Sequence, residues 1–256
     1  MVDMDIWQDI EQKKKRLDSL RPMTAKSLKA LADWYDVEIV FSSNALEGNT
    51  LTRSETAIVL EKGITVRGKP LKDHLEAIDH KDALDFIKAL AKEQGPIREN
   101  DIRQIHYLVL ARSNPKEAGK YSQHQRQIAG SKVVLPDPVE IPALMKDFGE
   151  WLAGADPVPE TAFESHFRLV AIHPFTDGNG RTARLLMNLV LFRGGYPPVL
   201  IEPELRADYI DALEHRHLEG EIEPYNQFMA ERLDESLDRT LKVAQKEVKP
   251  GLNGPG

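Results

Sequence analysis

The sequence contains no cysteine among its 256 residues. This absence excludes disulfide bonds, thiolate zinc sites and a cysteine nucleophile, and it fits the reducing cytoplasm. Long hydrophobic runs are also missing: the apolar stretch Leu185–Phe192 contains Asn188 and is far shorter than the roughly 20 residues of a membrane-spanning helix. The N-terminal segment lacks the apolar core of an export signal. We therefore expect a cytoplasmic protein without a membrane partner.

Basic residues are fewer than acidic ones: the sequence has 34 Lys and Arg residues and 41 Asp and Glu residues, which gives a net charge of −7. Broad nucleic-acid binding requires a basic face that neutralises phosphates, so we expect no nucleic-acid partner. The remaining composition, 41% hydrophobic and 29% charged, is typical of a globular protein. This length allows one large domain or two small ones.

Apolar residues recur at intervals of three and four over most of the chain, which predicts amphipathic helices and a mainly α-helical fold. The segment 119–138 lacks this spacing and has a turn sequence near Gly130, which indicates a β-hairpin. We expect an N-terminal helical segment over residues 1–55, a core over 56–240 and a frayed tail over 241–256.

The sequence HPFTDGNGRTAR at 173–184 lies between two predicted helices. Gly178 and Gly180 allow consecutive amides to turn toward one point, and amides at a helix start attract anions. Arg181 and Arg184 are three residues apart, so they lie near one another on that second helix. Arginine pairs well with phosphate oxygens. The segment therefore predicts a phosphate-binding loop.

Two further groups in this loop predict chemistry rather than binding alone. Asp177 offers an oxygen ligand of the kind that Mg²⁺ takes together with phosphates and water. His173, four residues earlier, can be neutral near pH 7 and act as a general base. Each residue alone has an ordinary explanation as a turn, cap or surface charge. Their conjunction favours a catalytic site that binds an anion and a metal ion.

The same segment resembles the signature of the Fic (Fido-fold) family, H-x-F-x-D/E-G-N-G-R-x-x-R, at each of its defining positions. The similarity extends over about residues 40 to 235. It implies an all-α Fic/Fido helical core with a short β-hairpin flap. Family members transfer a nucleotide monophosphate, usually AMP from ATP, to a hydroxyl side chain of a target protein.

By this resemblance the chain would be a protein adenylyltransferase that modifies a Ser, Thr or Tyr hydroxyl of a protein docked on the flap. His173 would be the catalytic base, and Asp177 would hold Mg²⁺, with Mn²⁺ as a substitute. The resemblance places a larger set of residues around ATP. These are Asp177, Gly178, Asn179, Gly180, Arg181, Thr182 and Arg184 of the loop, Ile128, Ala129 and Gly130 of the flap, and Tyr209 and His217 on the adenine side.

A second motif, Ser43-Asn-Ala-Leu-Glu47-Gly48, resembles the inhibitory motif S/T-x-x-x-E-G/N of the family. In that motif the glutamate pairs with the second arginine of the signature, which is Arg184 here. A carboxylate in the guanidinium fork would exclude the γ-phosphate of ATP by volume and by charge. The resemblance therefore implies self-inhibition, and removal of AMP from a modified target as a second activity.

Other functions stay open at this point. The same fold could transfer another nucleotide or phosphate-linked group. A non-catalytic helical module that binds anions and partner proteins is an alternative from a different class, and a metal phosphohydrolase is another. The sequence also leaves open whether the chain forms a homodimer.

Overall fold

The computed structural model describes residues 4–127 and 130–248, and within them it is helical, as predicted. The elements are α1 (Met4–Ser19), α2 (Ala25–Leu46), α3 (Arg53–Lys62), α4 (Leu71–Leu90), α5 (Glu99–Leu110), α6 (Ile141–Ala153), α7 (Pro159–Ile172), α8 (Asn179–Arg193), the short 3₁₀ helix η1 (Pro203–Leu205), α9 (Arg206–Glu219) and α10 (Glu223–Val248).

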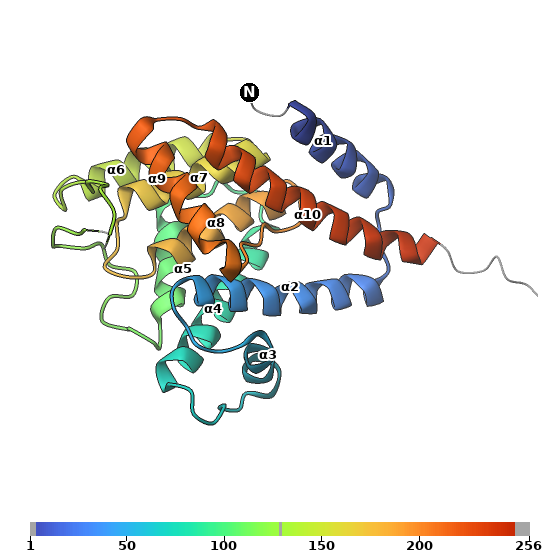
Figure 1. The fold of residues 1–256 in the computed structure, drawn as a ribbon, viewed down its shortest axis with the longest axis horizontal. Coiled ribbons are helices and arrows are strands. Elements are labelled where there is room, and N and C mark those ends of the chain that lie inside the picture. Colours follow the sequence, from blue (N-terminus) through green and yellow to red (C-terminus); the bar gives the residue numbers. More distant parts are fainter. Residues whose placement is uncertain (1–3, 128–129, 249–256) are drawn as a thin grey trace, which may run out of the picture.

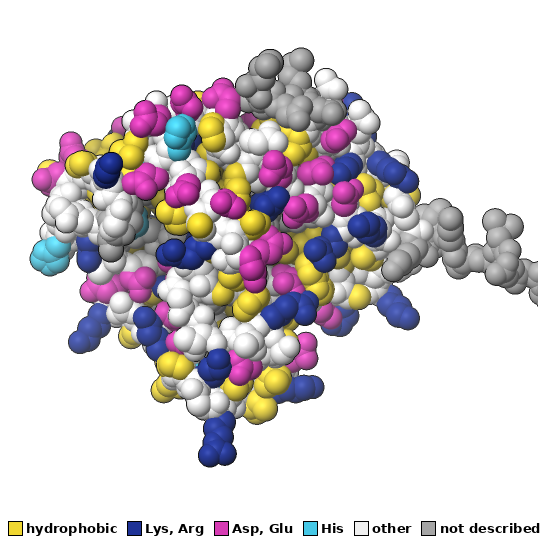
Figure 2. Space-filling model, viewed as in Figure 1, with side chains coloured by type: hydrophobic (Ala, Val, Ile, Leu, Met, Phe, Trp, Pro, Cys, Tyr) yellow, Lys and Arg dark blue, Asp and Glu magenta, His cyan; other side chains and the backbone are white. Residues whose placement is uncertain are grey.

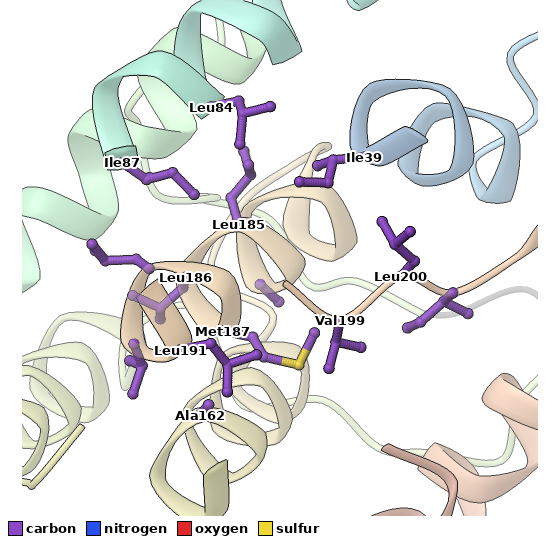
Figure 3. Close-up of a cluster of buried hydrophobic side chains, with 14 of the residues drawn as sticks. Ile39, Leu84, Ile87, Ala162, Leu185, Leu186, Met187, Leu191, Val199 and Leu200 are labelled. Atoms are coloured by element: carbon purple, nitrogen blue, oxygen red, sulfur yellow. The ribbon is translucent and has the colours of Figure 1, made fainter. Parts of the chain in front are cut away.

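Helix α8 lies at the centre of the molecule, with α7, α5, α4 and α2 packed around it (Figure 1). Its residues from Arg181 to Leu191 are all buried, including the polar side chains of Arg184 and Asn188, because other helices enclose it. Figure 3 shows Leu185, Leu186, Met187 and Leu191 of α8 among side chains from these neighbours. The partners labelled there are Ile39 of α2, Leu84 and Ile87 of α4, Ala162 of α7, and Val199 and Leu200.

The N-terminal helix α1 lies along α10, near the other end of the chain (Figure 1). Ile10 and Leu17 of α1 are buried in this contact, which joins them to the hydrophobic core. Lys13 adds ion pairs with Asp234 at 2.7 Å and Asp238 at 2.9 Å. Burial of the apolar side chains supplies most of the stabilisation, because partly exposed ion pairs contribute little.

Helix α10 continues to Val248, although the sequence analysis assigned residues 241–256 to a frayed tail. Leu241 and Ala244 are buried against the core, so apolar burial holds the helix beyond residue 241. The residues from 249 onward lie outside the described part.

Basic and acidic side chains are interspersed on the face shown in Figure 2. No described helix is long and apolar enough to cross a membrane.

The predicted β-hairpin is corrected by the structure. In the described parts of 119–138 the backbone forms one isolated bridge, between Tyr121 and Phe175, and no ladder within the segment. The two arms approach through a side chain instead, since Gln125 Nε2 donates to the Leu135 carbonyl at 3.0 Å. Pro136 and Pro138 cannot donate backbone hydrogen bonds, which disfavours a ladder here.

A buried aspartate joins α4 to the end of α5, the helix that supports the motif loop. Asp79 is fully buried, and its carboxylate accepts hydrogen bonds from the backbone amides of Arg112 and Ser113 at 2.8 to 3.1 Å. It also accepts one from Arg112 Nη1 at 3.0 Å. These bonds satisfy backbone amides of the residues that follow the end of α5.

We predict that Asp79→Ala lowers the free energy of unfolding by about 2–4 kcal/mol, because buried amides lose their acceptor. Asp82→Ala is the matched control: Asp82 also pairs with Arg112, at 2.7 Å, but its side chain is 43% exposed. That variant should lose less than about 1 kcal/mol. Urea denaturation measures both, and equal losses would contradict the assigned role of Asp79.

Candidate active site

The candidate active site begins where α7 ends and α8 starts. His173 follows the last residue of α7 and has a left-handed backbone with φ of 49°, which turns the chain out of the helix. Asn179, the first residue of α8, then closes the loop on itself: its Oδ1 accepts from the Phe175 amide at 2.9 Å and its Nδ2 donates to the Phe175 carbonyl at 2.8 Å. The Asn179 side chain therefore shapes the loop, and both ends of its amide are occupied.

A buried histidine from α5 packs against the motif loop and supports it. His106 is fully buried and stacks on Phe175 with ring centroids 3.6 Å apart. Its Nδ1 accepts from the Gly119 amide at 3.0 Å, so its Nε2 carries the proton and donates to the Asp177 carbonyl at 2.9 Å. Burial lowers the pKa of His106 to about 4, which keeps this tautomer neutral.

The role of His106 could not be predicted from the sequence, because its neighbours on α5, such as Ile102 and Ile105, are typical of an ordinary core face. Gly178 shows why the loop needs glycine at this contact. Its backbone has φ of 78°, and a β-carbon there would lie 3.4 Å from the His106 ring. Such a residue would be strained by its backbone as well as crowded.

Asp177 is the acidic group of the loop. Its Oδ1 accepts from the Gly178 amide at 2.6 Å and from Arg181 Nη2 at 3.1 Å, while its side chain stays 43% exposed. No group of three or more metal-binding side chains occurs among the described residues. The single carboxylate of Asp177 still fits Mg²⁺, which needs only one or two carboxylates when phosphates and water complete its coordination shell.

The two arginines of the motif are both buried but have different partners. Arg181 is 2% exposed and lies between Asp177 and Glu76 of α4, with its Nη1 3.3 Å from Glu76 Oε1. Glu76 is held by Asn49 Nδ2 at 3.0 Å. Arg181 is thus fixed between two carboxylates at the start of α8.

Arg184 reaches α2, 137 positions earlier in the chain. Its Nη2 donates to Glu47 Oε1 at 2.7 Å, and also to the Ser43 carbonyl at 2.9 Å. Its Nε donates to the Ser43 hydroxyl at 2.9 Å. The structure therefore brings together the residues that the inhibitory motif relates, and it places Glu47 directly after the last turn of α2.

The close approach of Glu47 depends on Gly180. A β-carbon at Gly180 would overlap Glu47 Oε1 and lie 2.9 Å from Arg184 Nη1. Glu47 thus occupies space directly beside the first turn of α8, where backbone amides favour an anion. Gly48 follows with φ of 90°, a left-handed conformation that ends α2 beyond the glutamate.

Charge and burial set the protonation of this cluster. Burial raises the pKa of Glu47, but Arg184, and to a lesser extent Arg181, outweigh it and hold that pKa below its usual value. The carboxylate is therefore ionised at neutral pH. For His173 burial is the largest effect and lowers its pKa, against opposing contributions from the Val170 carbonyl and Glu47. The neutral, proton-accepting form of His173 is favoured.

Behind Arg184 lies a buried chain of hydrogen bonds. The Tyr225 hydroxyl donates to the Phe163 carbonyl at 3.0 Å, so it accepts from His166 Nδ1 at 2.8 Å. Burial lowers the pKa of His166 to about 3, and the neutral ring then accepts the Tyr209 proton at Nε2, at 2.8 Å. The Tyr209 oxygen faces the Arg184 guanidinium with its lone pairs.

Of the residues that the resemblance places around ATP, only some lie together at the motif loop. Tyr209 is 3% exposed and turned toward His166 rather than toward an open cleft. His217 packs against Phe167, with ring centroids 6.2 Å apart, and Thr182 is fully buried inside the α8 packing. Gly130 has φ of 82° in a turn of the loop. Ile128 and Ala129 lie outside the described residues.

The loop that carries Gly130 is nevertheless tied to α9. Glu214 Oε1 of α9 accepts from the Ser131 hydroxyl at 2.8 Å and from the Lys132 amide at 3.0 Å. On its other side the loop is joined to the motif, since the Ser122 amide donates to the Pro174 carbonyl at 2.8 Å. The loop therefore borders the site even though it forms no hairpin ladder in its described part.

Comparison with known proteins identifies the family. A family model for Fic/DOC proteins matches residues 96–191, which include the whole motif. A solved Fic domain-containing signalling protein from Bacteroides thetaiotaomicron has a TM-score of 0.87 and 30% identity, covering 97% of this chain and 100% of that chain. The chain belongs to the Fic/DOC family.

Two further relatives match most of this Fic/DOC chain. The solved Fic-1 segment from Caenorhabditis elegans has a TM-score of 0.85 and 32% identity, covering 97% of this chain and 75% of that one. A curated relative from Nematostella vectensis, named protein adenylyltransferase Fic, is 37% identical over 94% of this chain and 56% of its own length. The Fic/DOC chain therefore spans about half the length of that curated relative.

We predict that Tyr209→Phe lowers the free energy of unfolding of this Fic/DOC chain by about 1–2 kcal/mol, because His166 Nε2 and Arg184 both lose a buried partner. Tyr107→Phe is the control, since Tyr107 is 48% exposed. It should change stability by less than about 0.5 kcal/mol. Urea denaturation compares the two variants. An unchanged free energy of unfolding in Tyr209→Phe would show that the buried chain of hydrogen bonds does not hold Arg184.

Proposed function

We propose that this chain is a self-inhibited protein adenylyltransferase, which moves AMP from ATP to a Ser, Thr or Tyr hydroxyl of a target protein. The observation that carries the proposal is the position of His173 and Asp177 beside the open start of α8, with Arg181 and Arg184 behind it. The name of the curated relative from Nematostella vectensis supports the same reaction class.

In the proposed reaction, neutral His173 takes the proton of the target hydroxyl as its oxygen attacks the α-phosphorus of ATP. The new bond joins that oxygen to phosphorus, and the bond to the β-phosphate oxygen breaks, so pyrophosphate leaves. Arg181 and the first amides of α8 stabilise the charge on the phosphates, which is the main catalytic demand of this chemistry. Asp177 would hold Mg²⁺, or Mn²⁺ in its place, to neutralise further phosphate charge.

Glu47 restrains the enzyme by occupying Arg184. With the carboxylate at 2.7 Å from Nη2, a γ-phosphate cannot reach the same guanidinium, and the volume beside Gly180 is filled. ATP that binds without this contact would lack a charged anchor at its γ end. Displacement of Glu47 frees the anchor, so the inhibition is a competition between one carboxylate and one phosphate.

The target segment would lie along the loop over residues 120–138, next to His173. Arg126 of this loop is close enough to His173 to lower its pKa, which supports a short path from the loop to the base. The described part of this loop forms no ladder of its own, and an extended target segment would pair with its backbone. The loop would in this way present the hydroxyl to His173.

A second activity, removal of AMP from the modified target, is favoured by one feature. Glu47 is 41% exposed on its side chain, and in the described part of the chain only its Oε1 is bonded. The other oxygen can therefore orient a water for attack on the modified hydroxyl's phosphate. The same carboxylate would then inhibit transfer and assist its reversal.

We predict that Glu47→Gly speeds labelling of protein by α-labelled ATP and Mg²⁺ by roughly 10- to 100-fold, as expected for a partly exposed carboxylate–arginine pair. Mass spectrometry should find AMP on a hydroxyl side chain. His173→Ala in the same background should abolish labelling while nucleotide binding stays nearly intact.

The outcomes of this experiment separate the alternatives. A different added mass would keep the fold and change the donor, nucleotide turnover without labelled protein would indicate a phosphohydrolase, and binding without either reaction would indicate an interaction module. Glu47→Gly should add little speed in an Arg184→Ala background if it acts through Arg184. Equal stimulation in both backgrounds would refute the proposed route of inhibition.

The pH dependence should follow His173. Because burial lowers its pKa below 6.5, the proton-accepting form predominates at neutral pH and is lost on acidification. We therefore expect kcat/KM of the Glu47→Gly variant to rise with pH through a midpoint below 6.5 and to level off by about pH 7.5. A rate series from about pH 5 to 8.5 at fixed MgATP tests this, and a midpoint above 6.5 would contradict the role of a buried histidine base.

A further inference from the structure

A cavity of about 640 Å³ lies away from the motif, where the N-terminal half of α2 meets α1, the end of α8 and α10. This volume is in the range of sites that hold small molecules. Leu31 and Glu47 are 16 residues apart on α2, which corresponds to about 24 Å at the helical rise. The cavity is therefore separate from the proposed nucleotide site.

The wall of the cavity is mainly apolar. Met23, Leu28 and Leu31 line one side and Phe192 with Pro197 the other. Leu28 is 48% exposed, so a large aliphatic side chain is left open at the entrance. A hydrocarbon that displaces water from an apolar cavity of this kind binds with a favourable free energy, because apolar surface is removed from water.

The one aromatic hydroxyl buried in the wall is already satisfied inside the protein. The Tyr35 hydroxyl lies 3.1 Å from the Ser236 carbonyl and 3.2 Å from the Thr240 hydroxyl. Tyr35 therefore offers the cavity the apolar surface of its ring, and its hydroxyl needs no hydrogen bond from a ligand. The polar recognition of an occupant has to come from the edge of the cavity.

The charged side chains that line the cavity are cationic. Arg21 and Lys88 contribute to the wall, and no carboxylate of the described residues does. Lys88 is already paired with Asp36 outside the wall, so Arg21 is the cation left for an occupant. Arg21 is oriented by its Nη2 hydrogen bond to the Gly195 carbonyl at 2.7 Å and stays 44% exposed. Its Nη1 also contacts Asp18 at 3.3 Å, but Asp18 is shared with Lys14, so the partly exposed guanidinium has donors left for a further anionic partner. This edge therefore favours an anion.

We propose that the cavity is a binding site for a small aliphatic carboxylate, a medium-chain fatty acid in chemical terms. The hydrocarbon chain lies against Leu31 and Phe192, and the carboxylate pairs with Arg21. The arrangement matches both properties of the wall: apolar area for the chain and an oriented guanidinium for the head. The site requires no nucleotide and no transfer reaction, so it stands independently of the proposed function.

The test is calorimetric titration of the full chain with hexanoate, octanoate and decanoate below their micelle concentrations. Affinity should rise about fourfold for each added methylene. Octanoate should bind roughly tenfold more tightly than 1-octanol, because only the acid can pair with Arg21. Arg21→Gln should remove that preference, and Lys29→Gln, on an exposed α2 lysine outside the wall, should not.

A matched pair of variants locates the site. Ala32→Trp places an indole in the cavity and should weaken octanoate binding more than tenfold. Ala30→Trp adds the same side chain to an exposed position of α2 that does not line the cavity, and should leave binding unchanged. Urea denaturation of both variants verifies that each is folded. Octanoate binding unaffected by Ala32→Trp would overturn the proposal.

Two further results would also overturn it. Equal affinity for octanoate and 1-octanol would show an apolar site without carboxylate recognition. Sedimentation velocity addresses the other occupant that such a face could take, a second copy of the chain. A wild-type dimer that Ala32→Trp converts to monomer would assign the cavity to self-association, whereas a monomer that binds octanoate in a saturable manner supports the ligand site.

Discussion

The buried guanidinium of Arg184 is the group on which the arrangement of the site depends. It is 6% exposed, and a cation removed from water costs several kcal/mol unless partners compensate. Its partners come from distant parts of the chain: Ser43 and Glu47 at the end of α2 and Tyr209 on α9. Satisfying this one charge therefore requires both helices to dock against α8, which also builds the walls of the site.

The same requirement makes the site suited to regulation. Arg184 needs an anionic partner, and a carboxylate of the chain or a phosphate of a ligand can supply it. Glu47 directly follows α2 and its side chain is 41% exposed, so a change of its side-chain rotamer would release Arg184 without unpacking the buried last turn of the helix. A ligand shifts such an equilibrium only by its differential affinity for the two arrangements. In the proposed enzyme the γ-phosphate and Glu47 compete on these terms.

The support of the motif loop shows how the geometry of the candidate site is held by buried groups behind it. Asn179 closes the loop through Phe175, and His106 holds the Asp177 carbonyl from beneath. Both are neutral groups that are fully bonded in a dry interior, where a hydrogen bond is strong and its loss costly. The fold itself thereby holds the motif residues in place.

The helices could be predicted because their apolar spacing is local, and the motif because its twelve residues carry their chemistry in one stretch. The course of the loop over 119–138 could not be predicted, since polar spacing alone does not reveal that Gln125 and Glu214 would tie its arms through side chains. Nor could the role of His106, whose apolar neighbours on α5 resemble any core helix.

The sequence by itself determined the helical class, the family resemblance and the chemical character of residues 173–184. Only the tertiary structure decided that Glu47 lies against Gly180 while it holds Arg184, that His106 is a neutral donor to the loop, and that Tyr209 faces inward to His166. The physical reason is that propensity and spacing act over a few residues. The direction of a buried polar side chain is instead set by which distant helix supplies its partner, and that depends on how whole helices pack.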